Sequence, residues 1–214
     1  MAIQFMELPN PSNSNLPLRV ARGHFATSHS HINYYFDLTM TKHRLSEARE
    51  AAVQLASKFK GSTMIDTILC LDGTEVIGAC MASELTKVGF TSVNAHRTIY
   101  VVPPEHTTGS QLIFRDNVEP MIKGKHVLIL AASVTTGYTA QGAIEAIRYY
   151  GGMVVGICSI LANNDECFGY KVTSIYNTKG VLPDYESKPS YECALCKAGV
   201  KLDAMVNTYG ISGF

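Results

Sequence analysis

The segment from Ser133 to Thr139 contains the residue types that bind phosphate. It reads Ser-Val-Thr-Thr-Gly-Tyr-Thr and follows a short apolar run, Val127 to Ala132. Hydroxyl groups donate hydrogen bonds to phosphate oxygens, and glycine lets an oxygen approach the backbone closely. If a helix begins at this segment, its first amides and the positive end of its dipole add to the attraction. The segment therefore predicts an anion site, and a capped helix after a core strand is the alternative.

The elements on either side must hold this segment in place. The run 127–132 is too short for anything but a buried strand, and Ala140, Ile144 and Ile147 behind the segment repeat at helical spacing. A second strand–turn–helix unit spans 67–88, with Asp72-Gly73-Thr74 as its turn and Gly89 as its stop. Strands that alternate with helices indicate a parallel sheet covered on both faces, with ligands beyond the carboxyl ends of the strands.

The rest of the chain supplies further elements of the same kind. Residues 44–60 carry an apolar stripe typical of an amphipathic helix, made of Leu45, Ala48, Ala52, Leu55 and Phe59, and Gly61 ends it. We expect further strands at 96–102, 153–162 and 172–176, an exposed mobile loop at 105–110, and an irregular arm at 1–17. The turns after Leu71, Val102 and Ala132 should meet at one edge of the sheet.

The charge balance of the chain excludes several classes of partner. The 214 residues include 18 Lys and Arg and 18 Asp and Glu, so the net charge is zero. This balance argues against a general surface for nucleic acid or anionic membranes. No apolar run approaches the ~20 residues of a membrane helix, and the N-terminus lacks a signal-peptide pattern. We expect a cytoplasmic protein of one domain.

Histidine and cysteine residues raise two metal hypotheses. His29 and His31 would share a face of a strand, but only Asp37 stands nearby as a further ligand, so a solvated or substrate-facing loop is favoured. Cys193 and Cys196 form a C-x-x-C pair, which is half a zinc site at most and would need two more ligands. A redox pair is the other alternative, and a reduced structural turn is favoured. The sequence assigns no metal ligand.

Several stretches from about Gly23 to the tail together resemble the orotate phosphoribosyltransferases. VLILAASVTTGYTA is similar to the motif with which that family binds phosphoribosyl diphosphate: an apolar strand, two acidic residues and a Thr-Thr-Gly turn. GHFATSHSHINYYFDL resembles its substrate loop, TILCLDGTEVIGACMA its second strand–turn–helix, and IYVVPPEHTTG its mobile catalytic loop. ECALCKAGVKLDA resembles C-terminal tails of some members.

The resemblance implies a fold, partners and site residues. The fold would be an α/β phosphoribosyltransferase-type domain over 1–214, a parallel sheet flanked by helices with a small hood from about 1–40 and 180–214. The partners would be a phosphoribosyl or nucleotide ligand, Mg2+ as cofactor, and a second copy of the chain whose mobile loop reaches across to its partner's site. The implied phosphate-binding residues are Ser133, Thr135, Thr136, Gly137, Tyr138 and Thr139. The implied substrate-binding residues are Tyr35, Phe36, Asp72, Gly73 and His106, with Tyr35 and Phe36 as candidates for stacking on a ring.

The chain departs from the family pattern where that pattern carries charge. Ala131 and Ala132 stand in place of the two acidic residues, which hold the ribose hydroxyls and support the charge that develops at the sugar carbon. Val102-Pro103-Pro104 stand where the family has an Arg-Lys-Glu run, and His106 falls near the position of a later family Lys. Ser28 falls at the position of another family Lys, and Asn163 falls near the position of the Arg with which the family reads the orotate carboxylate. Because phosphoribosyl transfer needs preorganised opposite charge, ordinary transfer should be very slow.

The sequence thus predicts an orotate phosphoribosyltransferase-like protein that binds a phosphoribosyl compound or nucleotide, with pentosyl transfer in pyrimidine or nucleotide metabolism as its reaction. A catalytically inactive nucleotide-sensing or binding module on the same fold is the alternative. A third hypothesis is a hydrolase or ligase that uses His106, or His29 and His31, as acid–base groups. No catalytic residue is assigned.

Overall fold

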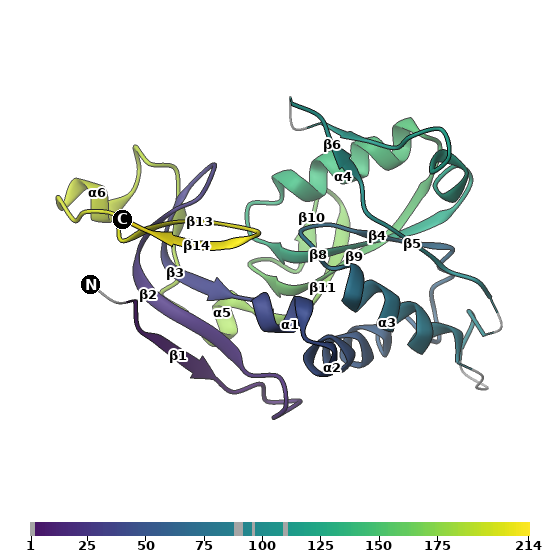
Figure 1. Ribbon diagram of the computed structural model, residues 1–214, viewed down its shortest axis with the longest axis horizontal. Coiled ribbons are helices and arrows are strands. Elements are labelled where there is room, and N and C mark those ends of the chain that lie inside the picture. Colours follow the sequence, from purple (N-terminus) through teal and green to yellow (C-terminus); the bar gives the residue numbers. More distant parts are fainter. Residues whose placement is uncertain (1–2, 88–91, 96, 109–110) are drawn as a thin grey trace.

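The buried apolar runs of the sequence form a parallel sheet at the centre of the chain (Figure 1). The computed structural model describes residues 3–87, 92–95, 97–108 and 111–214. The central strands are β4 (Thr67–Cys70), β5 (Tyr100–Val102), β8 (His126–Val134), β9 (Met153–Ala162), β10 (Glu166–Cys167) and β11 (Tyr170–Asn177). Their order is β10-β11-β9-β8-β4-β5, and only β10 runs antiparallel to its neighbour.

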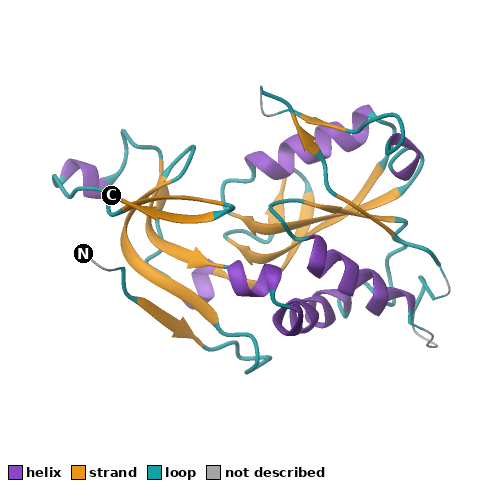
Figure 2. Ribbon diagram, viewed as in Figure 1, coloured by secondary structure: helices purple, strands orange, loops and turns teal. Residues whose placement is uncertain are grey.

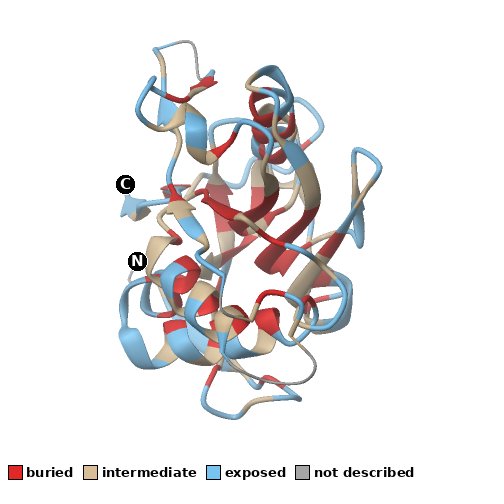
Figure 3. Cartoon of the chain, turned by 90° about the vertical axis from the view of Figure 1, so that its right-hand side faces the viewer, coloured by how far each residue is buried: buried red, intermediate tan, exposed pale blue. Residues whose placement is uncertain are grey.

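Helices cover both faces of this sheet (Figure 2). On one face, α2 (Leu45–Ala56) and α3 (Glu75–Thr86) pack on alternate residues of the strands, among them Ile68 and Leu130. On the other face, α4 (Tyr138–Tyr149) buries Ile144 and Ile147 against the intervening strand residues. Figure 3 shows the buried strands of the sheet, drawn in red, between these helices. The expected parallel sheet with helices on both faces is confirmed.

Segments from the two ends of the chain form a second sheet, which we call the hood sheet. Its strands are β1 (Phe5–Leu8), β2 (Leu18–Ala26), β3 (His31–Asp37), β12 (Ser187–Lys188), β13 (Ala204–Asn207) and β14 (Gly210–Gly213). The order is β12-β3-β2-β13-β14, and β1 also pairs with β2. β2 and β13 are parallel, with Phe25 opposite Ala204. Phe25, Tyr35 and Val206 contribute to a small apolar core of the hood sheet.

Short elements connect the two sheets. α1 (Thr39–His43) leads from β3 into α2, and α5 (Thr178–Val181) leads from β11 back to the hood sheet. The 3-10 helix η1 (Glu119–Met121) precedes β8, and α6 (Ala194–Lys197) precedes β13. β6 (Glu105–His106) and β7 (Leu112–Ile113) form a separate antiparallel ladder. No helix among the described residues is long and apolar enough to cross a membrane.

The structure corrects several predicted boundaries. The strand expected at 127–132 extends to Val134, because Ser133 and Val134 still pair with Leu161 and Ala162 of β9. The predicted anion segment therefore begins inside the strand. The helix expected at 44–60 ends at Ala56, since the backbone then tightens to a bond from the Lys58 amide to the Leu55 carbonyl.

Four other expectations also change. The arm at 1–17 contains a strand, β1, and buries Leu16 completely, so it is partly ordered into the hood sheet. The strand predicted at 96–102 begins only at Tyr100, and the loop predicted at 105–110 opens with β6. Leu45 of the predicted apolar stripe is 52% exposed, because it is the first residue of α2. Val88, Gly89 and His96, and residues 109–110, lie outside the described residues.

Candidate functional site

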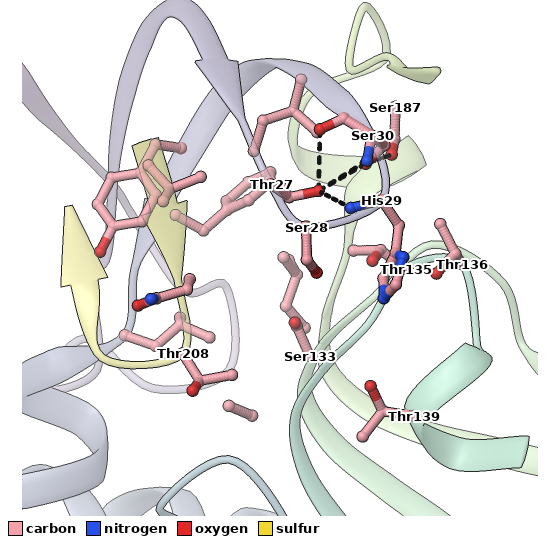
Figure 4. Close-up of a pocket in the computed structure, with 18 of the residues that line it drawn as sticks. Thr27, Ser28, His29, Ser30, Ser133, Thr135, Thr136, Thr139, Ser187 and Thr208 are labelled. Carbon is pink, nitrogen blue, oxygen red and sulfur yellow. Dashed lines mark hydrogen bonds between the residues drawn. The ribbon is translucent and has the colours of Figure 1, made fainter. Parts of the chain in front are cut away.

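A pocket of about 230 Å³ lies between the hood sheet and the carboxyl edge of the central sheet (Figure 4). Most of the residues around it come from four places: the end of β8 with the start of α4, the turn between β2 and β3, β3 with α1, and the turn between β13 and β14. The pocket lies beyond the carboxyl ends of the parallel strands, which is where ligands bind in such sheets. The sequence predicted this location from the order of strands and helices.

The predicted phosphate segment forms one wall of this pocket. Ser133, Thr135, Thr136 and Thr139 line it, so most of the expected hydroxyl groups meet there. Gly137 is the N-cap of α4, and no side chain caps the helix. The first amides of α4 therefore have no capping side chain as a partner, and the positive end of the helix dipole lies at the pocket.

The backbone at Gly137 requires glycine. Its φ of +83° lies in the left-handed region, which side chains with a Cβ atom disfavour. A Cβ atom at this position would also come within 2.7 Å of the Cys167 sulfur and 3.3 Å of the Phe168 ring. Tyr138, the next predicted residue, is not among the residues that line the pocket: its side chain is 63% exposed and its ring lies 5.9 Å from that of His29.

The turn from Thr27 to Ser30 faces the phosphate segment across the pocket (Figure 4). Thr27 Oγ1 accepts a hydrogen bond from the Ser30 amide at 2.9 Å and also lies 2.9 Å from the Ser30 carbonyl oxygen. Ser187 Oγ donates to Ser30 Oγ at 3.0 Å, which ties β12 to the turn. These bonds fix a polar turn with Ser28 and His29 in the pocket wall. Sequence analysis placed this stretch in a loop resembling the family's substrate loop and considered His29 as an acid–base group, but it did not name Thr27 or Ser30 as site residues.

Lys42 is a pocket residue that sequence analysis missed. Its side chain is buried, and Nζ donates to the carbonyl oxygens of Asp72 at 3.0 Å and Thr208 at 2.6 Å. Burial lowers the pKa of Lys42, while the neighbouring carboxylates of Asp72, Glu75 and Asp37 oppose that effect. An isolated lysine in a short polar helix gives no sequence signal, because only the tertiary fold makes it buried.

Of the five predicted substrate-binding residues, three are absent from the described lining of the pocket. Asp72 and Gly73 lie behind Lys42 in left-handed backbone conformations, with φ of +60° and +75°. Burial raises the pKa of Asp72, against the lowering effect of Lys42 and of the Ala132 amide. His106 is exposed on β6 and is not among the residues that line the pocket, but it lies close enough to Asp72 for its charge to lower the pKa of that carboxyl group.

The two predicted ring-stacking residues both line the pocket, but they differ in how deeply their side chains are buried. Tyr35 belongs to the core of the hood sheet, where its ring lies 6.1 Å from that of Phe25, and burial raises its pKa to about 12. Phe36 is half-buried, and its ring meets Tyr185 edge-on at 5.1 Å. Stacking of either ring on a ligand remains a prediction.

The two alanines in place of the acidic residues point to opposite faces of β8. Ala131 packs in the apolar cluster beneath α4 and is 1% exposed, whereas Ala132 lines the pocket. No aspartate or glutamate is among the described residues that line the pocket. Since protein-bound Mg2+ requires oxygen ligands and is usually held by one or two carboxylates, these residues do not fit a protein-held Mg2+ ion.

The predicted pair of His29 and His31 is separated. β3 begins only at His31, so His29 belongs to the preceding turn and the strand alternation that would align them does not reach it. His29 lines the pocket, while His31 Nδ1 lies 3.1 Å from Cys196 Sγ outside it. The two histidines therefore do not form one acid–base or metal-binding pair.

Comparison with known proteins identifies relatives of this chain. The model of the phosphoribosyl transferase domain matches residues 37–171. The orotate phosphoribosyltransferase of Caldanaerobacter subterraneus subsp. tengcongensis is 28% identical over 185 residues, which cover 86% of this chain and 88% of that protein.

Two solved structures share the fold at lower identity. The UMP synthase of Leishmania donovani superposes with a TM-score of 0.55 at 19% identity, over 85% of this chain and 36% of that one. The orotate phosphoribosyltransferase of Mycobacterium tuberculosis H37Rv, in complex with inorganic phosphate, has a TM-score of 0.50 at 16% identity, over 68% of this chain and 78% of that one.

We predict that Gly137→Ala destabilises the chain by about 1–3 kcal/mol, because the new methyl group adds left-handed strain to its clash with Cys167. The matched control is Gly142→Ala in the same helix, where a Cβ atom meets nothing within 4 Å. That variant should gain up to about 1 kcal/mol from helix propensity. Urea unfolding of both variants measures the difference, and equal stabilities would refute the assignment of Gly137 as a conformational requirement.

Proposed function

The chain belongs to the phosphoribosyl transferase domain family, as an orotate phosphoribosyltransferase-like member of type I, and on this premise we propose that its pocket binds the 5′-phosphate of a phosphoribosyl compound or nucleotide. The bound phosphate would lie against residues 133–139. The reaction that this binding serves is pentosyl transfer in pyrimidine or nucleotide metabolism.

The observation that carries the proposal is the meeting of three phosphate-binding features in one pocket. Hydroxyl groups of Thr135, Thr136 and Thr139 line it, the uncapped N-terminus of α4 opens onto it, and the ammonium group of Lys42 lies in its wall. Lys42 Nζ has three hydrogen atoms and uses two on backbone carbonyls, which leaves one for an anion. A phosphate monoester is the anion that this donor set suits.

The presence of alanine at position 132 in the pocket wall favours a second candidate function, in which the protein binds its ligand without turning it over. Pentosyl transfer develops positive charge at the sugar carbon, and the described lining offers no carboxylate to stabilise it. Lys42 would instead repel such a charge. A nucleotide-sensing or binding module needs only the phosphate contacts. The two candidates therefore differ in chemistry at the sugar carbon and agree on the phosphate site.

We extend the proposal to a homodimer. The ladder of β6 and β7 places His106 on an exposed surface, outside the lining of its own pocket. A loop of this kind acts on substrate if it reaches the pocket of a second copy, as the family resemblance implies. Sedimentation equilibrium should give twice the mass of the chain at micromolar concentration, and a purely monomeric species would contradict this part of the proposal.

We predict that ribose 5-phosphate binds without Mg2+, because the phosphate contacts come from the protein alone. Thr136→Val and Thr139→Val each remove one hydroxyl donor while keeping the shape of the side chain, so each should weaken binding about fivefold, or about 1 kcal/mol. Calorimetric titration with and without Mg2+ measures the affinity. Thr173→Val on β11, outside the pocket, is the matched control and should bind as the unaltered protein does. No heat with ribose 5-phosphate would rule out the phosphate site.

We predict that Ala132→Asp raises orotate turnover above that of the unaltered protein, because it restores one carboxylate to the pocket wall. Ala131→Asp is the matched comparison. It would bury a carboxylate in the apolar cluster beneath α4 and should lower stability by several kcal/mol. Steady-state assays with orotate and phosphoribosyl diphosphate, together with thermal unfolding, measure both effects. A folded Ala132→Asp variant with no gain in turnover would indicate a site built for binding alone.

A further inference from the structure

The C-terminal segment brings two cysteines against two histidines of the hood sheet. His24 lies in β2, His31 begins β3, and Cys193 and Cys196 flank the first turn of α6. One ligand atom from each of the four lies within 4.8 Å of all the others. His24 and Cys193 are buried, His31 is half-buried and Cys196 is exposed. The cluster lies outside the lining of the pocket described above. We propose that these four residues bind one zinc ion.

The distances match a tetrahedral site. His24 Nε2 lies 3.2 Å from His31 Nδ1, 3.4 Å from Cys193 Sγ and 3.6 Å from Cys196 Sγ. His31 Nδ1 lies 3.1 Å from Cys196 Sγ. Bond lengths of about 2.3 Å to sulfur and 2.0–2.1 Å to nitrogen imply ligand–ligand edges of roughly 3.3–3.8 Å in a tetrahedron. These four edges lie within a few tenths of an ångström of the tetrahedral values, and the two remaining edges, from Cys193 Sγ to Cys196 Sγ and to His31 Nδ1, are within 4.8 Å.

The ring nitrogen of His24 that faces away from the cluster, Nδ1, makes the kind of hydrogen bond that metal-binding histidines usually make. Nδ1 lies 2.9 Å from the carbonyl oxygen of Val200, which can only accept, so Nδ1 must donate the proton. This bond leaves the lone pair of Nε2 directed at the cluster in the neutral ring, which is the usual arrangement behind a zinc ligand. The His24 amide also donates to Asp203 Oδ2 at 2.8 Å, and the Asp203 amide donates to the His24 carbonyl oxygen at 2.8 Å.

Hydrogen bonds alone do not account for the convergence. The single lone pair of His24 Nε2 faces His31 and both thiols, and it can accept only one hydrogen along its axis. A cation at the centre satisfies all four atoms at once. Two thiolates with two imidazoles in a tetrahedron select zinc, and the C-x-x-C spacing is that of structural zinc sites. Four protein ligands leave no open position, so the ion is structural rather than catalytic.

The ion would connect the hood sheet to the segment that completes the pocket. α6 leads into β13, which pairs with β2 beside His24, and Val206, Asn207 and Thr208 line the pocket (Figure 1). Zinc at this point thus fixes one wall of the pocket from outside. The inference depends only on the four ligands and does not rest on the proposed phosphate site.

The test is the metal content of the untagged protein, purified with a thiol reductant, in the unaltered form and in the variants Cys196→Ser and His31→Ala. These two ligands are the more exposed ones, so their replacement disturbs packing least. Cys80→Ser is the matched control, because Cys80 is a half-buried free thiol in α3 outside the cluster. We expect about one zinc per chain in the unaltered protein and in the control. The two ligand variants should lose it, and their Tm should fall by roughly 10 °C.

Reconstitution provides a second readout that does not depend on variants. Metal-free unaltered protein titrated with CoCl2 should develop the visible absorption of tetrahedral cobalt with thiolate ligands, and ZnCl2 should abolish it. The proposal is overturned if the unaltered protein takes up neither metal under reducing conditions. Zinc retained by both ligand variants would also overturn it, as the ion would then lie elsewhere. Zinc lost from the variants with an unchanged Tm would overturn the structural role.

Discussion

The buried ammonium group of Lys42 holds together the parts of the chain that form the pocket. It contacts the turn after β4 through Asp72 and the turn between β13 and β14 through Thr208. These turns belong to different sheets, and α1, which carries Lys42, is one of the connections between the sheets. A charge buried at this depth is costly unless backbone oxygens and nearby carboxylates surround it. The two hydrogen bonds of Lys42 thus join the hood sheet to the edge of the central sheet.

The positive charge of Lys42 has a further effect on the chemistry of the pocket. With hydroxyl groups and a helix N-terminus as its other polar features, the pocket stabilises negative charge on several sides and positive charge on none of its described sides. Ala132 therefore matters more than Ala131, because only Ala132 faces this environment. The same motif position that defines the family likeness is the place where the electrostatics differ most from what pentosyl transfer requires.

The central sheet and its helices could be predicted from the sequence because their signals are local. Continuous apolar runs identify β4, β8 and β9, and the threonines and glycine after β8 identify the edge at which ligands bind. The hood sheet could not be predicted to the same degree, because its strands pair across long separations and β13 is only four residues long. Lys42 was missed, and His31 and the C-x-x-C pair were considered only as separate metal hypotheses without His24, for the same reason: burial and convergence exist only once distant segments meet.

The position of β2 at the centre of the hood sheet has a consequence for how the chain folds. β2 is among the first strands to be synthesised, yet it pairs with β13 near the C-terminus, and its His24 amide bonds to a residue 179 positions later. Closing so long a loop is slow and waits for the last residues to leave the ribosome. The central sheet is complete once β11 ends at Asn177, so it does not have to wait for the C-terminal strands. The binding pocket is therefore the last feature to form, and a chain stalled before β13 would carry a folded core without a ligand site.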